Sequence, residues 1–101
     1  MTHALLTSQQ PEEALALGAG WAAAGADVTV VLLDASTAVL RPNHDAADDL
    51  AAARDAGVRI WAHADAVTER AVEPRAAGVE LVDLDAVATL LGDPDTRAQW
   101  W

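Results

Sequence analysis

The sequence predicts an α/β fold of three layers, α/β/α, built on a mostly parallel sheet of about five strands. Two observations carry this prediction. Short apolar runs alternate along the chain with segments of helical pattern, and a glycine follows each of these segments. One run, at residues 28–33, is apolar on both faces, which is typical of a strand covered by helices on both sides. The 101 residues are expected to form one domain.

The first strand and the first helix are predicted near the start of the chain. Residues 3–7 are apolar enough for a short strand, and Pro11 suits the first turn of a helix. Gly25 is expected to end this helix, because glycine readily adopts the conformation that follows a last helical turn. Gly18 and Gly20 lower the helix propensity, but their small size allows the helix to approach a sheet closely.

The second strand is the apolar and β-branched run at residues 28–33. A loop is expected at residues 34–37, followed by a brief apolar segment at residues 38–40. Asp45 is expected to cap the next helix, since an aspartate side chain can accept hydrogen bonds from free backbone N–H groups. Gly57 ends that helix.

The third strand is predicted at residues 58–62 and leads directly into His63. Asp65 is expected to cap a helix through residues 67–72, because aspartate is a preferred capping residue. The Glu73-Pro74 pair interrupts that helix, since proline removes a backbone hydrogen bond.

The last part of the chain predicts one more strand, one more helix and a final edge strand. Residues 79–82 form the fourth strand, and Asp83 caps a helix over residues 84–91. Gly92 ends this helix. A short fifth strand is expected at residues 98–101.

Composition excludes several classes of function. The net charge is −10 and every basic side chain is an arginine, so the surface repels phosphate backbones and anionic membranes. We therefore expect no nucleic-acid partner and no membrane partner. The chain has no cysteine, which rules out disulfides, thiolate zinc sites and redox pairs. No metal-binding motif is present, and neither a metal nor a cofactor is expected.

The sequence also predicts a cytoplasmic location. The first residues lack the basic start of a signal peptide, and the apolar stretch at residues 14–26 is too short to cross a bilayer.

A candidate ligand site lies where the strands end. In open parallel sheets, ligands bind beyond the carboxyl ends of the strands. The polar residues after the predicted strands, with one arginine in the helix that follows the third strand, form the expected ligand-binding set: Thr7, Ser8, Asp34, Ser36, His63, Asp65 and Arg70. Serine, threonine and aspartate are also common helix caps, so capping alone is an alternative reading of several of these residues. Arg70 can equally pair with a neighbouring glutamate.

His63 is the candidate catalytic residue, as a general acid or base, because imidazole titrates near neutral pH. A structural imidazole bonded to a carbonyl is the alternative reading. His3 lies at the other end of the sheet and is not expected to share its site, and His44 is expected to be solvated in a loop. A Ser-His-Asp triad could be drawn from Ser36 or Ser8 with His63 and Asp65, but no GxSxG turn supports it.

Trp100 and Trp101 form an apolar pair that is expected to be buried against a neighbouring element or another subunit. We interpret both as candidate interface residues.

Several segments together resemble the DsrE/DsrF-like family of sulfur-relay proteins, which includes TusD-type subunits. Residues 5–12 resemble that family's first strand and helix start, and residues 25–34 resemble its second strand. Residues 57–63 followed by Arg70 are similar to its third strand and active loop, and residues 78–81 and 97–101 to its last strands. The resemblance implies a DsrE-like fold and a homo-oligomer, often a trimer or hexamer, with a dimer also possible.

The chain departs from the family at its functional position. Sulfur-relay members carry a persulfide on a cysteine after the third strand, and His63 stands at that place here. Persulfide transfer is therefore excluded. Three hypotheses follow, namely a non-catalytic subunit that binds a small ligand or a protein partner, a small enzyme using His63, and a structural assembly partner in a sulfur-metabolism complex. The first is favoured over the enzyme.

Overall fold

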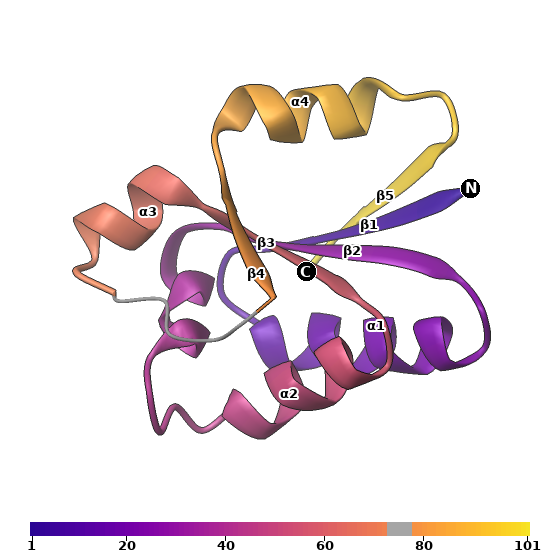
Figure 1. The fold of residues 1–101 in the computed structure, drawn as a ribbon. Helices are drawn as coiled ribbons and strands as arrows, with labels where there is room; N and C mark the ends of the chain where they lie inside the picture. The colour runs from indigo at the N-terminus through magenta and orange to yellow at the C-terminus, as the bar shows by residue number, and fades with distance from the viewer. Residues whose placement is uncertain (73–77) are drawn as a thin grey trace.

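Figure 1 shows a computed structural model of the chain, in which a central sheet lies between α1 and α2 on one face and α4 on the other. The structure describes residues 1–72 and 78–101. The interruption expected at Glu73-Pro74 lies outside the described residues.

The strands and helices alternate along the chain as the sequence predicts. The strands are β1 Thr2–Thr7, β2 Asp27–Leu32, β3 Arg59–His63, β4 Val79–Val82 and β5 Thr96–Trp100. The helices are α1 Pro11–Ala23, the 3₁₀ helix η1 Asp34–Leu40, α2 Ala47–Asp55, α3 Ala64–Glu69 and α4 Leu84–Gly92.

The sheet has the order β4-β3-β2-β1-β5, and all of its pairings among the described residues are parallel. The predicted three-layer α/β/α fold with a parallel five-stranded sheet is confirmed. β4 and β5 are the edge strands. All strands end at one edge of the sheet, where η1 and α3 also lie against each other (Figure 1).

Side chains alternate between two apolar clusters, one on each face of the sheet. Leu5, Val30 and Ile60 pack with α1 and α2 in the larger cluster. Leu6 and Val31 face the other way and pack with Val87 of α4 in the smaller one. A single described helix, α4, contributes to this second face, which is therefore less completely covered than the first.

Gly18 brings α1 close to the sheet. A Cβ atom at this position would lie 3.3 Å from side-chain carbons of both Val28 and Val30. Gly20, by contrast, has open space where its Cβ would be. The close approach predicted from the small residues of this helix therefore depends on Gly18 alone.

Some predicted element boundaries are wrong. The expected loop and apolar segment at residues 34–40 form one 3₁₀ helix, η1. Ala46 rather than Asp45 occupies the N-cap of α2, and no side chain caps it. His63 rather than Asp65 occupies the N-cap of α3, because this helix begins directly after β3 and ends at Glu69. Capping by Asp83 is confirmed, since its Oδ1 accepts a hydrogen bond of 2.8 Å from the Ala86 N–H.

Of the helices in residues 1–72 and 78–101, none has the length and apolar character needed to cross a bilayer.

Candidate functional site

The carboxyl ends of β1 and β2 are joined by hydroxyl groups that the sequence places in the candidate site. The Ser36 hydroxyl is wholly buried and lies 2.7 Å from the Thr7 carbonyl oxygen and 2.6 Å from that of Leu33. A hydroxyl has one proton, so it donates to one of these carbonyls at a time. The backbone N–H of Ser36 donates to the Ser8 carbonyl oxygen at 2.8 Å. Ser36 therefore holds the start of η1 against the end of β1.

Thr7 is also used inside the fold. Its side chain is fully buried, and its Oγ1 accepts a hydrogen bond of 3.1 Å from the Gln10 N–H. This bond shapes the turn that leads from β1 into α1. The hydroxyls of Thr7 and Ser36 thus already have protein partners, which a nucleophile aimed at a substrate would have to give up.

Asp34 is exposed and stands at a sharp turn, with a backbone φ of +47°. Aspartate tolerates this left-handed conformation better than most residues do. Its carbonyl oxygen accepts a hydrogen bond of 2.8 Å from the Thr37 hydroxyl. Asp34 therefore begins η1 while its carboxylate remains open to water.

His63 and Asp65 lie together at the end of β3. The Nε2 atom of His63 is 3.9 Å from Oδ2 of Asp65, a distance that makes an ion pair only when the imidazole is protonated. The His63 side chain is 16% exposed and that of Asp65 is 85% exposed. His63 pairs with Val82 of β4 in the sheet, on the face that α4 covers. The imidazole is therefore mostly enclosed but still reaches the surface.

Arg70 lies at the far end of α3 from His63, and it is exposed. Its carbonyl oxygen accepts a hydrogen bond of 2.9 Å from the Arg41 guanidinium. The structure thus brings Thr7, Ser8 and Ser36 together as one bonded group and His63 and Asp65 together as another. No hydrogen bond or ion pair among the described residues joins Asp34 or Arg70 to His63 through a side chain.

Two histidines outside the candidate site have structural contacts. The ring of His3 lies 5.1 Å from the ring of Trp21 on the α1 side of the sheet, which separates it from His63 as expected. The Nδ1 atom of His44 accepts a hydrogen bond of 3.1 Å from the Ala46 N–H at the start of α2. His44 lies in a loop as expected and is half-buried, and its ring bonds the backbone next to the start of α2.

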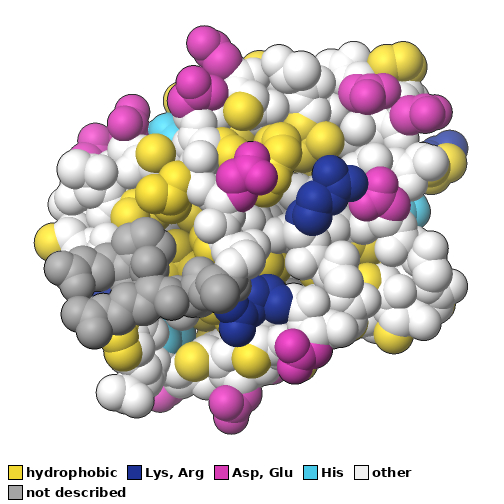
Figure 2. Space-filling model, viewed as in Figure 1, with side chains coloured by type: hydrophobic (Ala, Val, Ile, Leu, Met, Phe, Trp, Pro, Cys, Tyr) yellow, Lys and Arg dark blue, Asp and Glu magenta, His cyan; other side chains and the backbone are white. Residues whose placement is uncertain are grey.

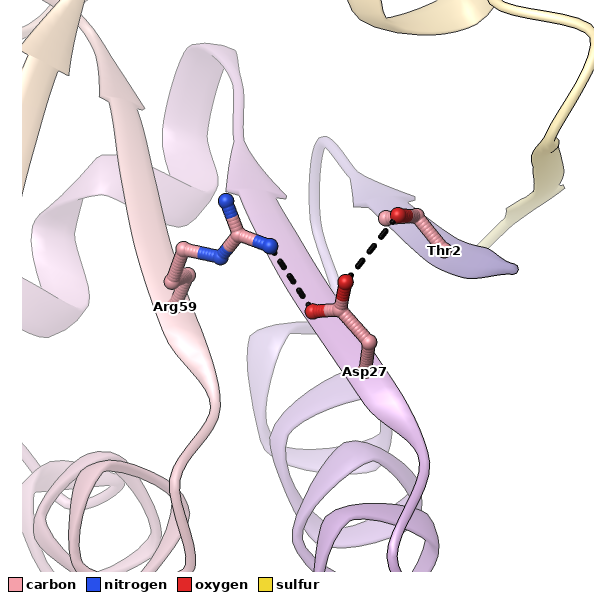
Figure 3. A network of polar contacts seen from close by, with 3 residues as sticks. All are labelled: Thr2, Asp27 and Arg59. Atoms are coloured by element: carbon pink, nitrogen blue, oxygen red, sulfur yellow. Dashed lines mark hydrogen bonds and ion pairs between the residues drawn. The ribbon is translucent and has the colours of Figure 1, made fainter.

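A polar network at the opposite, amino end of the sheet was missed by sequence reasoning. Asp27 of β2 accepts a hydrogen bond of 2.8 Å from the Arg59 guanidinium of β3 and one of 3.1 Å from the Thr2 hydroxyl of β1 (Figure 3). The hydrogen bond from Arg59 is the largest cause that lowers the pKa of Asp27 below its ordinary value of 3.8, while partial burial opposes this shift. All three residues lie at the starts of strands. This shared position is the sequence feature from which their contact could have been predicted.

A pocket of about 440 Å³ lies next to this network, between the sheet and α4. Figure 2 shows hydrophobic side chains gathered between α4 and the sheet, with a basic side chain at their margin. The lining combines an aromatic ring, a guanidinium and several hydroxyls, and its residues are Thr2, Arg59, Trp61, Ala86, Thr89, Leu90, Asp93 and Thr96.

Large apolar side chains remain exposed on the other side of α4 and on β5. Leu84 is 58% exposed and Trp100 is 64% exposed. Leu91 is also exposed, whereas Trp101 is half-buried and packs on the larger cluster. The two tryptophans thus have different environments, although both were predicted to be buried at an interface or a neighbouring element. Across the described ranges, no group of three or more acidic or histidine side chains is placed to hold a metal ion.

Comparison with known proteins gives a result at the level of fold. No protein-family model matches the chain, and no curated protein sequence matches it. The crystal structure of the YchN protein from E. coli is similar over 100% of both chains, with a TM-score of 0.79 and 15% identity. A protein of unknown function from Methanobacterium thermoautotrophicum, MTH1491, is similar over 99% of this chain and 97% of its own, with a TM-score of 0.75 and 14% identity. Both neighbours are DsrE-like, and the chain shares the DsrE-like α/β/α fold with them.

Proposed function

We propose that this chain is a non-catalytic binding subunit with a DsrE-like fold, and that it binds a second copy of itself through β5 and the adjoining flank of α4. One observation carries the proposal. Exposed leucines of α4 and the exposed Trp100 border an edge strand that has no strand neighbour on its outer side in the described sheet. Persulfide transfer is not part of this function, because the chain has no thiol.

The exposed apolar side chains of α4 form a stripe on one flank of the helix. Leu84, Ala88 and Leu91 are spaced by four and three residues, so they share one side of a helix. Val87 and Leu90 turn toward the sheet, and Thr89 turns toward the pocket above β3. α4 is right-handed, it connects β4 to β5, and its Val87 and Leu90 face the sheet. In this orientation the stripe of Leu84, Ala88 and Leu91 lies toward the β5 side of the molecule.

β5 continues this apolar surface. Ala98 pairs with Ala4, and Trp100 pairs with Leu6, so both face the α4 side of the sheet. The exposed surface of β5 and the α4 stripe therefore lie on the same face at the same edge. Contiguous exposed apolar side chains of this kind mark interaction sites on soluble proteins.

The side chains of β5 suit antiparallel pairing with an identical strand. If Ala98 lies opposite Ala98 of the second copy, Arg97 lies opposite Gln99 and Thr96 lies opposite Trp100. No like charges face each other in this register, although the chain as a whole is strongly acidic. An interface in which one patch meets the same patch is the usual arrangement of a two-fold dimer.

The carboxyl ends of the strands support the non-catalytic part of the proposal. Thr7 and Ser36 have their hydroxyls bonded to the backbone, and Nε2 of His63 lies 3.9 Å from Oδ2 of Asp65, beyond hydrogen-bond distance. A catalytic group needs a neighbour that activates it within hydrogen-bond reach.

A single cysteine at Ala98 tests the proposed pairing. Since the natural chain has no cysteine, Ala98→Cys introduces the only thiol. Directly opposite residues in an antiparallel pair have Cα atoms about 4.5–5.5 Å apart, within the range that a disulfide spans. We expect mild oxidation at micromolar concentration to give a disulfide-linked dimer on a non-reducing gel.

The matched control is Ala16→Cys, at an exposed alanine of α1 on the opposite face of the sheet. It should cross-link much more slowly than Ala98→Cys. Equal rates for the two variants, or no dimer from Ala98→Cys, would show that β5 does not pair with itself.

A second candidate is an enzyme that uses His63 as a general acid or base. The observation in its favour is the proximity of His63 to Asp65, which could orient the imidazole. With any substrate turned over, the pH–rate profile would bend between about pH 5 and 8, and the bend would vanish in His63→Gln. A flat profile in the natural protein rules this candidate out.

A further inference from the structure

We infer that the pocket beneath α4 is a second binding site, and that it takes a small uncharged ring compound rich in hydrogen-bond acceptors, such as a nucleoside or a monosaccharide. This site lies at the amino end of the sheet, whereas His63 lies at the carboxyl end. It differs from the proposed self-association surface, which uses the other flank of α4, although Thr96 of β5 belongs to both.

The pocket has a size suited to a small molecule. Its volume of about 440 Å³ falls in the range typical of ligand sites. Residues of β1, β3, β5 and α4 line it, together with Asp93 of the turn that follows α4, and it is open to solvent.

Trp61 supplies the surface on which a ring can stack. It lies on the α4 face of β3, is only partly buried, and lines the pocket together with Ala86 and Leu90. Aromatic side chains offer a flat apolar face to a planar or saturated ring. A ring stacked on Trp61 would lie within the same pocket as the apolar side chain of Leu90.

Hydrogen-bond groups surround this stacking surface. Thr2, Thr89 and Thr96 are among the residues that line the pocket, and the Thr2 hydroxyl also donates a hydrogen bond to Asp27. Arg59 uses one nitrogen to bond Asp27, and a guanidinium has five N–H donors, so donors remain for acceptors on a ligand. Hydroxyl and carbonyl oxygens on a ring compound can accept hydrogen bonds from these donors.

The charges favour an uncharged ligand. Asp27 already compensates Arg59 at 2.8 Å, and the remaining charged residue of the lining is Asp93. The net charge of −10 adds to the repulsion of anions. Nucleosides and sugars share the remaining chemistry, which is a neutral ring that carries several oxygen acceptors.

The test uses uridine and methyl glucoside as separate probes with the full chain, by saturation-transfer NMR and calorimetry. We expect saturable binding of one probe with a dissociation constant below about 1 mM. Trp61→Leu should weaken it by at least about tenfold through lost stacking. Because Trp61 also packs in the smaller apolar cluster, Thr89→Phe serves as a second variant that fills the pocket from an exposed helix position.

The control is Thr68→Phe, at an exposed threonine of α3 outside the pocket lining. Loss of binding in Thr89→Phe with retention in Thr68→Phe supports the site, and the probe that binds identifies the class of ligand. The inference is overturned if neither probe binds with a dissociation constant below about 1 mM, or if the two phenylalanine variants bind equally well.

Discussion

The hydroxyl of Ser36 lies 2.7 Å from the carbonyl oxygen of Thr7, and this contact joins the first turn of η1 to the end of β1. The residues are 29 positions apart in the chain. The contact is buried, and it turns a side chain expected to bind a ligand into one that binds the protein's own backbone.

Ser36→Ala is expected to destabilise the fold by about 0.5–1.5 kcal/mol, because it removes a buried hydrogen bond. The two carbonyl groups keep their backbone donors, which are the N–H groups of Leu33 and Ser36. The free energy of unfolding can be measured by urea titration followed by tryptophan fluorescence. Ser8→Ala is the matched control. Ser8 contacts Ser36 only through its backbone carbonyl, which accepts the Ser36 N–H, among the hydrogen bonds of the described residues. Ser8→Ala keeps this carbonyl and therefore keeps the hydrogen bond. Similar losses in the two variants would contradict a structural role for the Ser36 hydroxyl.

Asp27→Asn is expected to remove a small, pH-dependent contribution to stability. Since the pKa of Asp27 is lowered in the folded state, its contribution is full above the ordinary value of 3.8 and is lost as the pH falls through the lower folded-state pKa. Both partners are about half exposed, so the contribution should stay below about 1 kcal/mol.

The measurement is the difference in unfolding free energy between the natural protein and Asp27→Asn, taken from pH 7 down to acid and at two salt concentrations. This difference should shrink toward low pH and in high salt, which screens exposed charges. A difference that grows as the pH falls would show that the pKa is not lowered.

Gly18 and Gly20 are expected to respond to substitution in opposite directions. Gly18→Val should cost about 1–3 kcal/mol, because the added atoms meet Val28 and Val30. Gly20→Ala should stabilise α1 by about 0.5–1 kcal/mol, since its Cβ meets open space and alanine is the better helix former. Thermal unfolding of both variants measures the two effects. A Gly18→Val protein as stable as the natural one would mean that α1 does not press on the sheet there.

The fold could be predicted because hydrophobic alternation records which residues face a core. The run at residues 28–33 is apolar on both faces, and β2 lies at the centre of the sheet. Strand order could not be read in this way, since any parallel arrangement has the same local pattern. The start of α3 was misplaced because no loop separates it from β3, and a capping preference says nothing about loop length.

The site was harder to predict than the fold. The sequence shows that Thr7 and Ser36 follow strands, but a hydroxyl that faces a ligand and one that bonds a carbonyl look the same in a sequence. The rule that parallel sheets bind ligands at the carboxyl ends of their strands does not point to Thr2, Asp27 and Arg59, because these residues lie at the amino ends. Their convergence depends on the strand order β3-β2-β1.

Sedimentation analysis of the natural chain, Ala88→Asp and Ala16→Asp at about 10 µM tests the self-association most directly. Both substitutions add one negative charge at an exposed helical alanine, but only Ala88 lies in the α4 stripe. The natural chain and Ala16→Asp are expected to sediment as a dimer or a larger assembly, and Ala88→Asp as a monomer. A natural chain that remains monomeric at this concentration, or an Ala88→Asp variant that assembles as the natural chain does, would contradict the proposed function.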